Sequence, residues 1–592
     1  MRPALALALA LALARALALA LALASCTLGP MRTAIVALAI AAFAAAAWEV
    51  RRDVADLDVP VDRHGAAFAG SGACARCHPD HHASWARTHH RRMTQEASDE
   101  TMLGAFDGRT LAYGGYVARM DRNAAGAFVV SVESARHEPL TRWTVERLVG
   151  SRRQQQLLAR EDDLWVRLPI AWDVEEGRFF HMNGAFLTSD PEGLGGEAPI
   201  ASSDYMRHAV RWNDNCVFCH NVGAEPRARS DGPLGLGAHE PAQRHWDTRV
   251  AELGVACEAC HGPGVEHVRA NASPFRRYVL HETGRADPTI TAPSRLARER
   301  QTDLCARCHG QRITDDMSRY LAHGDPFVPG DVLADTSRPL AIDTPLHGDT
   351  AAFAPRFWRD GTARLTAYEH QGVEQSRCGV TCSDCHAMHE GDPRGQLRPD
   401  RLGDAMCAGE CHVELANVSA ARAHSDHVDV ACVDCHMPRI VFGIRAIHRS
   451  HRIEVPDPNA NARDGRPDAC SLCHVDARLE DELFGGDPIE RAVAAAALGR
   501  ADHTDARARR LALLFETMRG DSYPAVRGIA WRSARSLGVQ AEVEAFTATD
   551  DGPTRARAVA ALAAREIVVT IDDPRIALLR ARADAHAIEV GE

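Results

Sequence analysis

Residues 256–267 read ACEACHGPGVEH, which contains two cysteines three positions apart, a histidine directly after the second, a Gly-Pro-Gly turn and another histidine. The CxxCH string occurs seven times in the chain and an expanded CxxxCH occurs once, so eight sites use sixteen of the eighteen cysteines. Chance would give only about 0.03 CxxCH strings at these cysteine and histidine frequencies. The repeated motif therefore decides how this chain is organised.

The spacing has a chemical reason. Two thiols on one turn can bond covalently to both vinyl groups of one haem, and the next residue, histidine, is then placed under the iron as an axial ligand. A zinc ribbon needs no histidine after each cysteine pair, and a disulfide framework would not repeat one pentapeptide. The motifs predict eight covalently bound haem c groups with their irons, including one at the longer CxxxCH.

The predicted attachment cysteines are Cys74, Cys77, Cys216, Cys219, Cys257, Cys260, Cys305, Cys308, Cys382, Cys385, Cys407, Cys411, Cys432, Cys435, Cys470 and Cys473. The predicted iron ligands that follow them are His78, His220, His261, His309, His386, His412, His436 and His474. Cys378 lies outside every motif, and we expect it to be a buried thiol.

Composition limits the remaining choices. The chain has 592 residues, 45% of them hydrophobic and 25% charged, which suits a soluble protein of two or three domains. Its net charge of −12, made more negative by haem propionates, argues against a nucleic-acid partner. All 68 basic residues are arginine, so the lysine-ligated haem of ammonia-forming nitrite reductases is excluded.

The N-terminus contains two apolar stretches that could each direct export. The first ends in Leu23-Ala24-Ser25-Cys26, which has the form of a lipoprotein cleavage box. The second runs from Thr33 to Trp48, where Ala45-Ala46-Ala47 offers a cleavage site and Arg51-Arg52 would favour a retained anchor. Either alternative predicts an exported protein, periplasmic or on the outer face of a membrane, with an extracellular location less favoured.

The patterns predict a mainly α fold with an irregular core stapled by haem, a small β-rich insertion and a C-terminal α-helical repeat domain. The expected boundaries are 1–50 for the signal sequence or anchor, 51–104 for the first haem segment, 105–200 for the insertion, 201–480 for the seven-haem core and 481–592 for the helical domain. Alternating segments such as GAFVVSVES and DLWVRLPIAWD indicate the strands of the insertion.

The C-terminal region has a short recurring pattern. RAVA, RGIA and RAVA begin at Arg491, Arg527 and Arg557, and a proline precedes each by three or four residues. This favours stacked helical hairpins of the HEAT type, which could bind a protein partner. An ordinary helical cap on the haem core is the alternative.

The stretch FAGSGACARCHPDHHASWARTHHRRM, at residues 68–93, resembles the opening of multihaem cytochromes of the cytochrome c-554 and c-prime type. GVACEACHGPGVEHV, GVTCSDCHAMHEG, VACVDCHMPR and HRSHRIEVPDPN follow in the order seen in large bacterial members with a C-terminal helical-repeat domain. The resemblance covers about residues 68–480 in detail. It implies kinship with octahaem oxidoreductases.

The resemblance also suggests histidines that bind the irons from the side opposite the CxxCH histidine. A short loop lets such a histidine leave its own haem and reach a neighbouring iron. The candidates are His267, His389, His89 or His90, His424 or His427, and His448 and His451.

Two classes of function follow. With every iron capped, the protein would transfer electrons to or from a redox partner protein or a quinol-linked cytochrome. With one iron open, it would be an oxidoreductase of small nitrogen or sulfur species such as hydroxylamine, nitrite or tetrathionate. A filament-forming extracellular cytochrome is a third, less favoured reading.

Overall fold

The computed structural model describes residues 30–592 apart from 231–243, 347, 428–429, 475–476, 501–505, 570, 572, 586–587 and 591–592. The lipoprotein box at Cys26 lies outside the described residues. The chain forms two compact units. The smaller unit comprises the chain up to Pro79 with Cys257–Ala297 and Val328–Gly330. The larger unit comprises Asp80–Ala256, Arg298–Phe327 and the chain from Asp331 onward.

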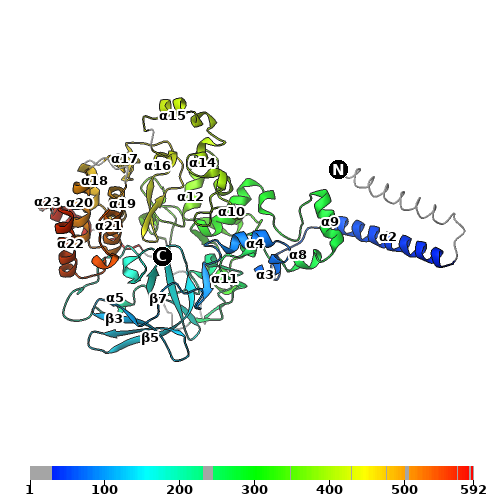
Figure 1. Cartoon of the computed structure of the whole chain (residues 1–592), viewed down its shortest axis with the longest axis horizontal. Coiled ribbons are helices and arrows are strands. Elements are labelled where there is room, and N and C mark those ends of the chain that lie inside the picture. The colour runs from blue at the N-terminus through cyan, green and yellow to red at the C-terminus, as the bar shows by residue number, and fades with distance from the viewer. Residues whose placement is uncertain are drawn as a thin grey trace. The chain divides into compact units, whose positions relative to one another are not determined.

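The smaller unit is built from helices (Figure 1). They are α2 (Pro30–Asp56), α3 (Ser71–Ala75), α7 (Cys257–His261), α8 (Val265–Ala270), α9 (Pro274–Thr283) and the 3-10 turn η3 (Pro293–Arg295). The C-terminal end of α2 packs on α9, where the Ser273 hydroxyl donates to the buried Asp53 carboxylate over 3.1 Å. Arg285 binds Asp58 over 2.6 Å just beyond the helix. These contacts fix the end of α2 to the unit.

Helix α2 is also long and apolar enough to cross a membrane. Its segment Ala34–Asp56 has 23 residues and a mean hydropathy of 1.7, and its most apolar window is not buried by the rest of the protein. A signal sequence near an N-terminus has the same properties. Length and composition therefore leave both readings of this segment open.

An antiparallel sheet dominates the N-terminal half of the larger unit (Figure 1). Its strands are β1 (Thr94–Glu96), β2 (Arg109–Tyr113), β3 (Tyr116–Arg122), β4 (Phe128–Ser134), β5 (Pro139–Val149), β6 (Gln154–Glu161), β7 (Leu164–Asp173), β8 (Arg178–His181) and β9 (Val210–Arg211). Strands β2 to β8 pair in chain order, β1 pairs with β5 and β9 pairs with β7. Because β2 and β8 also contact each other, the sheet is nearly closed into a barrel.

The prediction of a mainly α fold with a small β insertion is therefore wrong. The structure is 40% helix and 17% strand, and the sheet is a major element. The segments GAFVVSVES and DLWVRLPIAWD do contain β4 and β7. Strand β6 escaped detection because it begins with Gln154, Gln155 and Gln156, which are polar although buried. Backbone pairing with β5 and β7 makes this segment a strand, and sequence alternation cannot show that pairing.

Short helices, 3-10 turns and two-stranded ribbons make up much of the remaining chain. The helices are α4 (Pro79–Ala86), α5 (Ser202–Tyr205), α6 (Val217–His220), α10 (Arg298–His309), α11 (Met317–His323), α12 (Glu369–Glu374), α13 (Cys382–Cys385), α14 (Ala405–Ala408), α15 (Val418–His424), α16 (Cys432–His436) and α17 (Ala460–Asp464). The 3-10 turns are η1 (Met182–Gly184), η4 (Leu333–Asp335), η5 (Ala354–Arg356), η6 (Pro399–Arg401), η7 (Val413–Ala416) and η8 (Val543–Ala545). The ribbons pair β10 (Asn221–Val222) with β13 (Glu252–Leu253), β11 (Ala228–Ser230) with β12 (Arg244–Trp246), β14 (Arg312–Thr314) with β15 (Ser337–Pro339), and β16 (Arg439–Gly443) with β17 (Ala446–Arg449).

The C-terminal helices share one large apolar core (Figure 1). They are α18 (Ala477–Gly485), α19 (Pro488–Leu498), α20 (Arg507–Gly520), α21 (Pro524–Ser536), α22 (Gly552–Glu566) and α23 (Pro574–Asp584). Prolines start α19 and α21, as suits a residue whose fixed φ fits the first helical turn. Arg491 and Arg527 of the recurring pattern are both buried and paired with aspartates, whereas Arg557 is exposed. The third copy thus departs from the other two.

Burial of His181 at the end of β8 predicts a pH-dependent stability. Its ring donates to the Tyr205 carbonyl and accepts from the Asn183 N–H, and burial lowers its pKa to about 3. The unfolded chain binds this proton below about pH 6.5. The unfolded state then binds more protons than the folded state. The free energy of unfolding should therefore decrease as the pH is lowered from about 6.5 to about 3, by up to about 1.4 kcal/mol per pH unit.

We expect His181→Gln to reduce this slope in urea unfolding followed between about pH 7 and about pH 5. His137→Gln, at an exposed turn of the same sheet, is the matched control and should keep it. An unchanged slope in the His181 variant would contradict the account.

Candidate haem-binding sites

Each candidate attachment site is a single tight turn. In the regular motifs the histidine N–H donates to the carbonyl of the first cysteine, as for His78 to Cys74 over 2.9 Å and His474 to Cys470 over 2.8 Å. In the longer motif, His412 donates to Cys407 over 2.9 Å, so one extra residue is held inside the same closing bond. One helical turn places both cysteines on one side with the histidine beside them.

The thiols are available for covalent attachment. All cysteines in the described part of the chain are free of disulfides. Within those same residues, no three or more His, Cys, Asp and Glu side chains converge to hold an ion. A structural zinc ion would need four converging ligands, whereas a haem is bound at separated points by its vinyl carbons and its iron. The residues therefore fit haem, and Cys378 is exposed rather than buried as predicted.

Four of the motif histidines have a second histidine ring nearby. The ring centroids are 6.5 Å apart for His78 and His267, 6.2 Å for His309 and His90, 6.0 Å for His436 and His424, and 6.0 Å for His474 and His427. Two imidazoles that bind one metal from opposite sides, through bonds of about 2 Å, have centroids roughly 6 Å apart. In each of the four pairs, the spacing leaves room for one iron between the two rings.

The second ring nitrogen of several motif histidines is bonded to the protein. Nδ1 lies 2.8 Å from the Thr291 carbonyl in His261, 3.0 Å from the Gly395 carbonyl in His386 and 2.7 Å from the Glu454 carbonyl in His436. A carbonyl can only accept, so Nδ1 carries the proton and Nε2 is left with its lone pair. This is the tautomer that a haem iron requires.

Carboxylates lie in place of the carbonyl at His267 and His309. A third, Glu414, lies 3.7 Å from His412 Nδ1, but both of those side chains are exposed to solvent. Asp287 Oδ2 is 3.2 Å from His267 Nδ1, and Glu369 Oε2 is 3.6 Å from His309 Nδ1. Burial raises the pKa of Glu369, but its interactions with His309 outweigh this and hold that pKa at about 2. Glu369 in turn raises the pKa of His309 to about 9, against the effect of burial. Sequence reasoning missed both carboxylates because nothing local marks them.

The remaining predicted ligands lie elsewhere in the larger unit. His389 packs against His81, with ring centroids only 4.4 Å apart. His448 Nε2 lies 2.9 Å from the Gly443 carbonyl, and burial lowers its pKa to about 4. His451 is half-buried against α12, and desolvation together with the nearby His386 and His309 lowers its pKa.

Successive attachment sites of the larger unit adjoin through their cysteines. Side-chain interactions between Cys219 and Cys308, Cys305 and Cys382, and Cys407 and Cys432 shift the pKa of a thiol in each pair. The charge of Cys407 likewise raises the pKa of Cys385, and that of Cys435 raises the pKa of Cys470. The six sites thus form one continuous series that follows chain order, from 216–220 to 470–474.

The smaller unit holds the other two sites, at 74–78 and 257–261. Helices α3 and α7, which carry them, pack against each other. Glu258 lies between the two cysteines of the second site, and its buried carboxylate accepts from the N–H groups of Ala69 and Gly70 over 2.8 Å each. The chain entering the first site is therefore held by the second.

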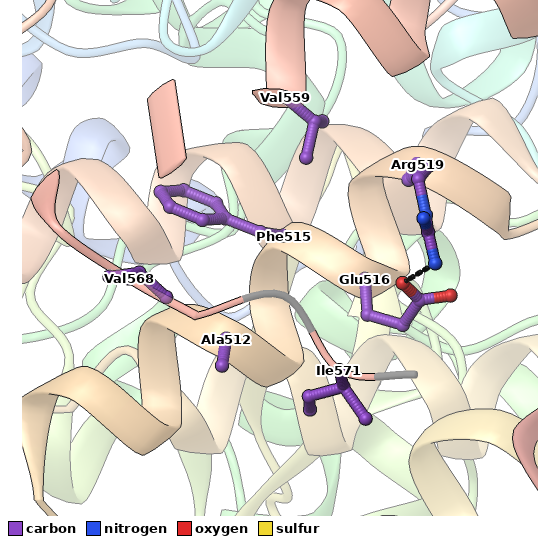
Figure 2. A pocket seen from close by; sticks show the side chains of 7 residues that line it. All are labelled: Ala512, Phe515, Glu516, Arg519, Val559, Val568 and Ile571. Atoms are coloured by element: carbon purple, nitrogen blue, oxygen red, sulfur yellow. Dashed lines mark hydrogen bonds and ion pairs between the residues drawn. The ribbon is translucent and has the colours of Figure 1, made fainter. Parts of the chain in front are cut away.

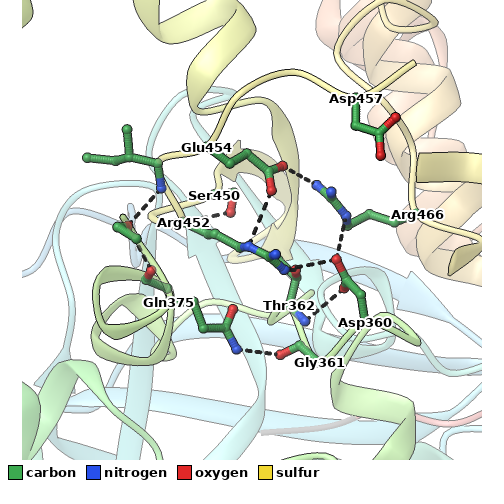
Figure 3. Close-up of polar contacts among 12 residues, drawn as sticks. Asp360, Gly361, Thr362, Gln375, Ser450, Arg452, Glu454, Asp457 and Arg466 are labelled. Atoms are coloured by element: carbon green, nitrogen blue, oxygen red, sulfur yellow. Dashed lines mark hydrogen bonds and ion pairs between the residues drawn. The ribbon is translucent and has the colours of Figure 1, made fainter. Parts of the chain in front are cut away.

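A buried polar network supports the 432–436 site (Figure 3). Arg452 donates to Asp360 over 2.9 Å and to Thr362 over 2.6 Å, and it pairs with Glu454 over 3.2 Å. Arg466 pairs with Asp360 over 3.1 Å and also with Glu454. These bonds hold the chain at Glu454, whose carbonyl faces His436.

A small cavity lies among the C-terminal helices (Figure 2). Its volume is about 10 Å³, and Phe515, Val559, Val568 and the ion-paired Glu516 and Arg519 are among the residues that line it. A space of roughly 10–15 Å³ is needed for one water molecule. This cavity is therefore too small for a substrate.

Comparison with known proteins places these motifs in context. No family model matches the chain. It is 19% identical over 223 residues to the multiheme cytochrome MtrA of Shewanella baltica (strain OS185), which is 38% of this chain and 52% of that protein. The chain thus spans about half the length of this curated relative. The crystal structure of the outer cell wall cytochrome OcwA is similar with a TM-score of 0.43 and 16% identity, covering 84% of this chain and 99% of that one.

The repeated attachment motifs fit covalently bound c-type haem. The relative with which the chain shares 19% identity is a multiheme cytochrome.

Proposed function

We propose that the protein is an octahaem cytochrome that carries electrons through closely spaced haems in a respiratory chain. The observation that carries the proposal is the unbroken series of six adjoining attachment sites in the larger unit. Bound haem supplies one-electron iron chemistry. The polypeptide fixes the order and the proximity of the attachment points. An isolated catalytic centre would not need such a series.

The histidine pairs support bis-histidine ligation at four of the sites. His267 would bind opposite His78, His90 opposite His309, His424 opposite His436, and His427 opposite His474. The sequence left open whether His424 or His427 is the ligand, and the geometry favours both, each at a different iron. His389, His448 and His451 remain proposed ligands of the other irons.

Donor and acceptor would be redox proteins outside the cytoplasm, and a quinol-linked cytochrome is a suitable donor. The net charge of −12 suits a basic partner. The C-terminal helices would offer a surface for binding a protein partner. The apolar α2 would serve as export signal or as anchor, which agrees with covalent haem attachment outside the cytoplasm.

A second candidate function rests on a specific observation. The four histidine pairs among the described residues include neither His386 nor His412, and of these two only His386 interacts with His451. An open iron at the 407–412 site would suit an oxidoreductase of small nitrogen or sulfur species.

Low-temperature EPR of the oxidised protein, with and without nitrite or hydroxylamine, separates the two functions. Electron transfer predicts only low-spin ferric signals that neither compound changes. A high-spin ferric signal that shifts on addition would overturn the proposal in favour of the enzyme.

A further inference from the structure

The histidines proposed as iron ligands differ in the groups that their Nδ1 atoms face. His261, His386 and His436 face neutral backbone carbonyls. His267 and His309 face carboxylates instead. We infer that Asp287 and Glu369 are positioning residues that lower the reduction potentials of two irons, those of the 74–78 and 305–309 sites. The comparison is with irons whose ligand histidines face carbonyls. The inference rests on the ligand pairs of the proposed function.

Asp287 is built into a fixed position beside His267. Its Oδ1 accepts from Arg276 over 2.8 Å and from the Thr289 hydroxyl over 2.6 Å. Its Oδ2 accepts from Asn271 over 2.7 Å and faces His267 Nδ1. The side chain of Asp287 is only 8% exposed, against 25% for that of His267. One oxygen is thus anchored by Arg276 while the other is directed at the ligand.

Glu369 reaches His309 from a different direction. It begins α12, and its Oε1 accepts from the Ala367 N–H over 3.2 Å. This bond directs Oε2 toward His309 Nδ1, 3.6 Å away. The same short helix carries Glu374, which pairs with His370 and not with a motif histidine. Only the first of these two glutamates therefore contacts a proposed ligand.

A carboxylate at Nδ1 acts on the iron in two ways. It makes the imidazole a stronger electron donor, and it adds a negative charge close to the metal. Both favour the ferric over the ferrous state, which carries one positive charge less. A carbonyl gives the same tautomer without the charge. The groups that face the five Nδ1 atoms, three carbonyls and two carboxylates, thus divide these histidines into two classes.

The test is a redox titration of the full-length haem protein, followed by visible absorption and EPR, for Asp287→Asn and Glu369→Gln. Glu266→Gln and Glu374→Gln are the matched controls. Glu266 lies on α8 with His267, and Glu374 lies on α12 with Glu369, so each control removes one carboxylate from the same helix without changing the group that faces a ligand Nδ1. In each test variant, one haem should show at least a threefold higher reduced-to-oxidised ratio at its original midpoint, a positive shift of about 28 mV. Both controls should leave all midpoints in place, and Asp287→Glu should restore part of the original value.

Asp287→Asn leaves Arg276 without its partner and could fail to fold, so Glu369→Gln decides in that case. Midpoints that stay unchanged in a protein with its full haem content, or that move equally in the controls, would overturn the inference alone. Absence of haem from the 74–78 and 305–309 sites of the unmodified protein would instead overturn the proposed function.

Discussion

Replacing Cys382 and Cys385 with serine is expected to remove one haem and divide the series of sites in two. This site is central, since Cys382 contacts Cys305 on one side and Cys385 interacts with Cys407 on the other. Without it, the 216–220 and 305–309 sites are separated from the 407–412, 432–436 and 470–474 sites. We expect redistribution of electrons between the two groups to slow at least about tenfold, which corresponds to a barrier only about 1.4 kcal/mol higher.

Flash reduction with a small donor, followed at the haem absorption bands, measures this redistribution. The protein with all sites should show one fast phase, and the double variant should show two separated phases. Cys378→Ser is the matched control, because it removes a thiol from the same stretch of sequence but from no haem motif. A single fast phase in the double variant, with one haem confirmed as lost, would contradict the proposed series.

Replacing His424 and His427 one at a time with alanine is expected to open two different irons. His424 faces His436 and His427 faces His474, each with ring centroids 6.0 Å apart. Loss of either ring leaves its iron with one protein ligand, so one of the eight proposed haems should change from low spin to high spin. The double variant should give twice the high-spin signal.

Quantitative EPR of the oxidised variants measures this result, and added imidazole should restore the low-spin state by replacing the missing ring. His281→Ala, on α9 and in none of the four pairs, is the control and should remain fully low spin. If only one of the two single variants gives a high-spin signal, the two histidines do not serve separate irons and the pairing is wrong.

The proposed attachment sites could be named from the sequence because all their chemistry lies within five or six consecutive residues. The proposed ligands His90 and His267 are separated from the histidines that they face, His309 and His78, by long stretches of chain. Spacing therefore named them only as candidates, and the choice between His424 and His427 needed the tertiary arrangement. Asp287 and Glu369 have no local pattern at all.

The fold was harder to predict than the sites. Pro488 and Pro524, which the sequence showed only as part of a recurring pattern, begin two C-terminal helices, because proline favours the first helical turn. The extent of the sheet was missed, since buried polar strands such as β6 depend on their neighbours and not on their own alternation. The prediction of a mainly α fold was wrong, because the sheet forms a major part of the N-terminal half.

All eight motifs, including the CxxxCH at 407–412, are expected to bind haem covalently. Mass spectrometry of the exported protein under denaturing conditions tests it most directly, because only covalently attached haem stays with the chain. The account predicts the mass of the processed polypeptide plus eight haems, falling by one haem when Cys407 and Cys411 are both replaced with serine. A mass that corresponds to fewer than eight haems would contradict this expectation. So would a double variant whose mass differs from that of the unmodified protein only by the two cysteine-to-serine changes.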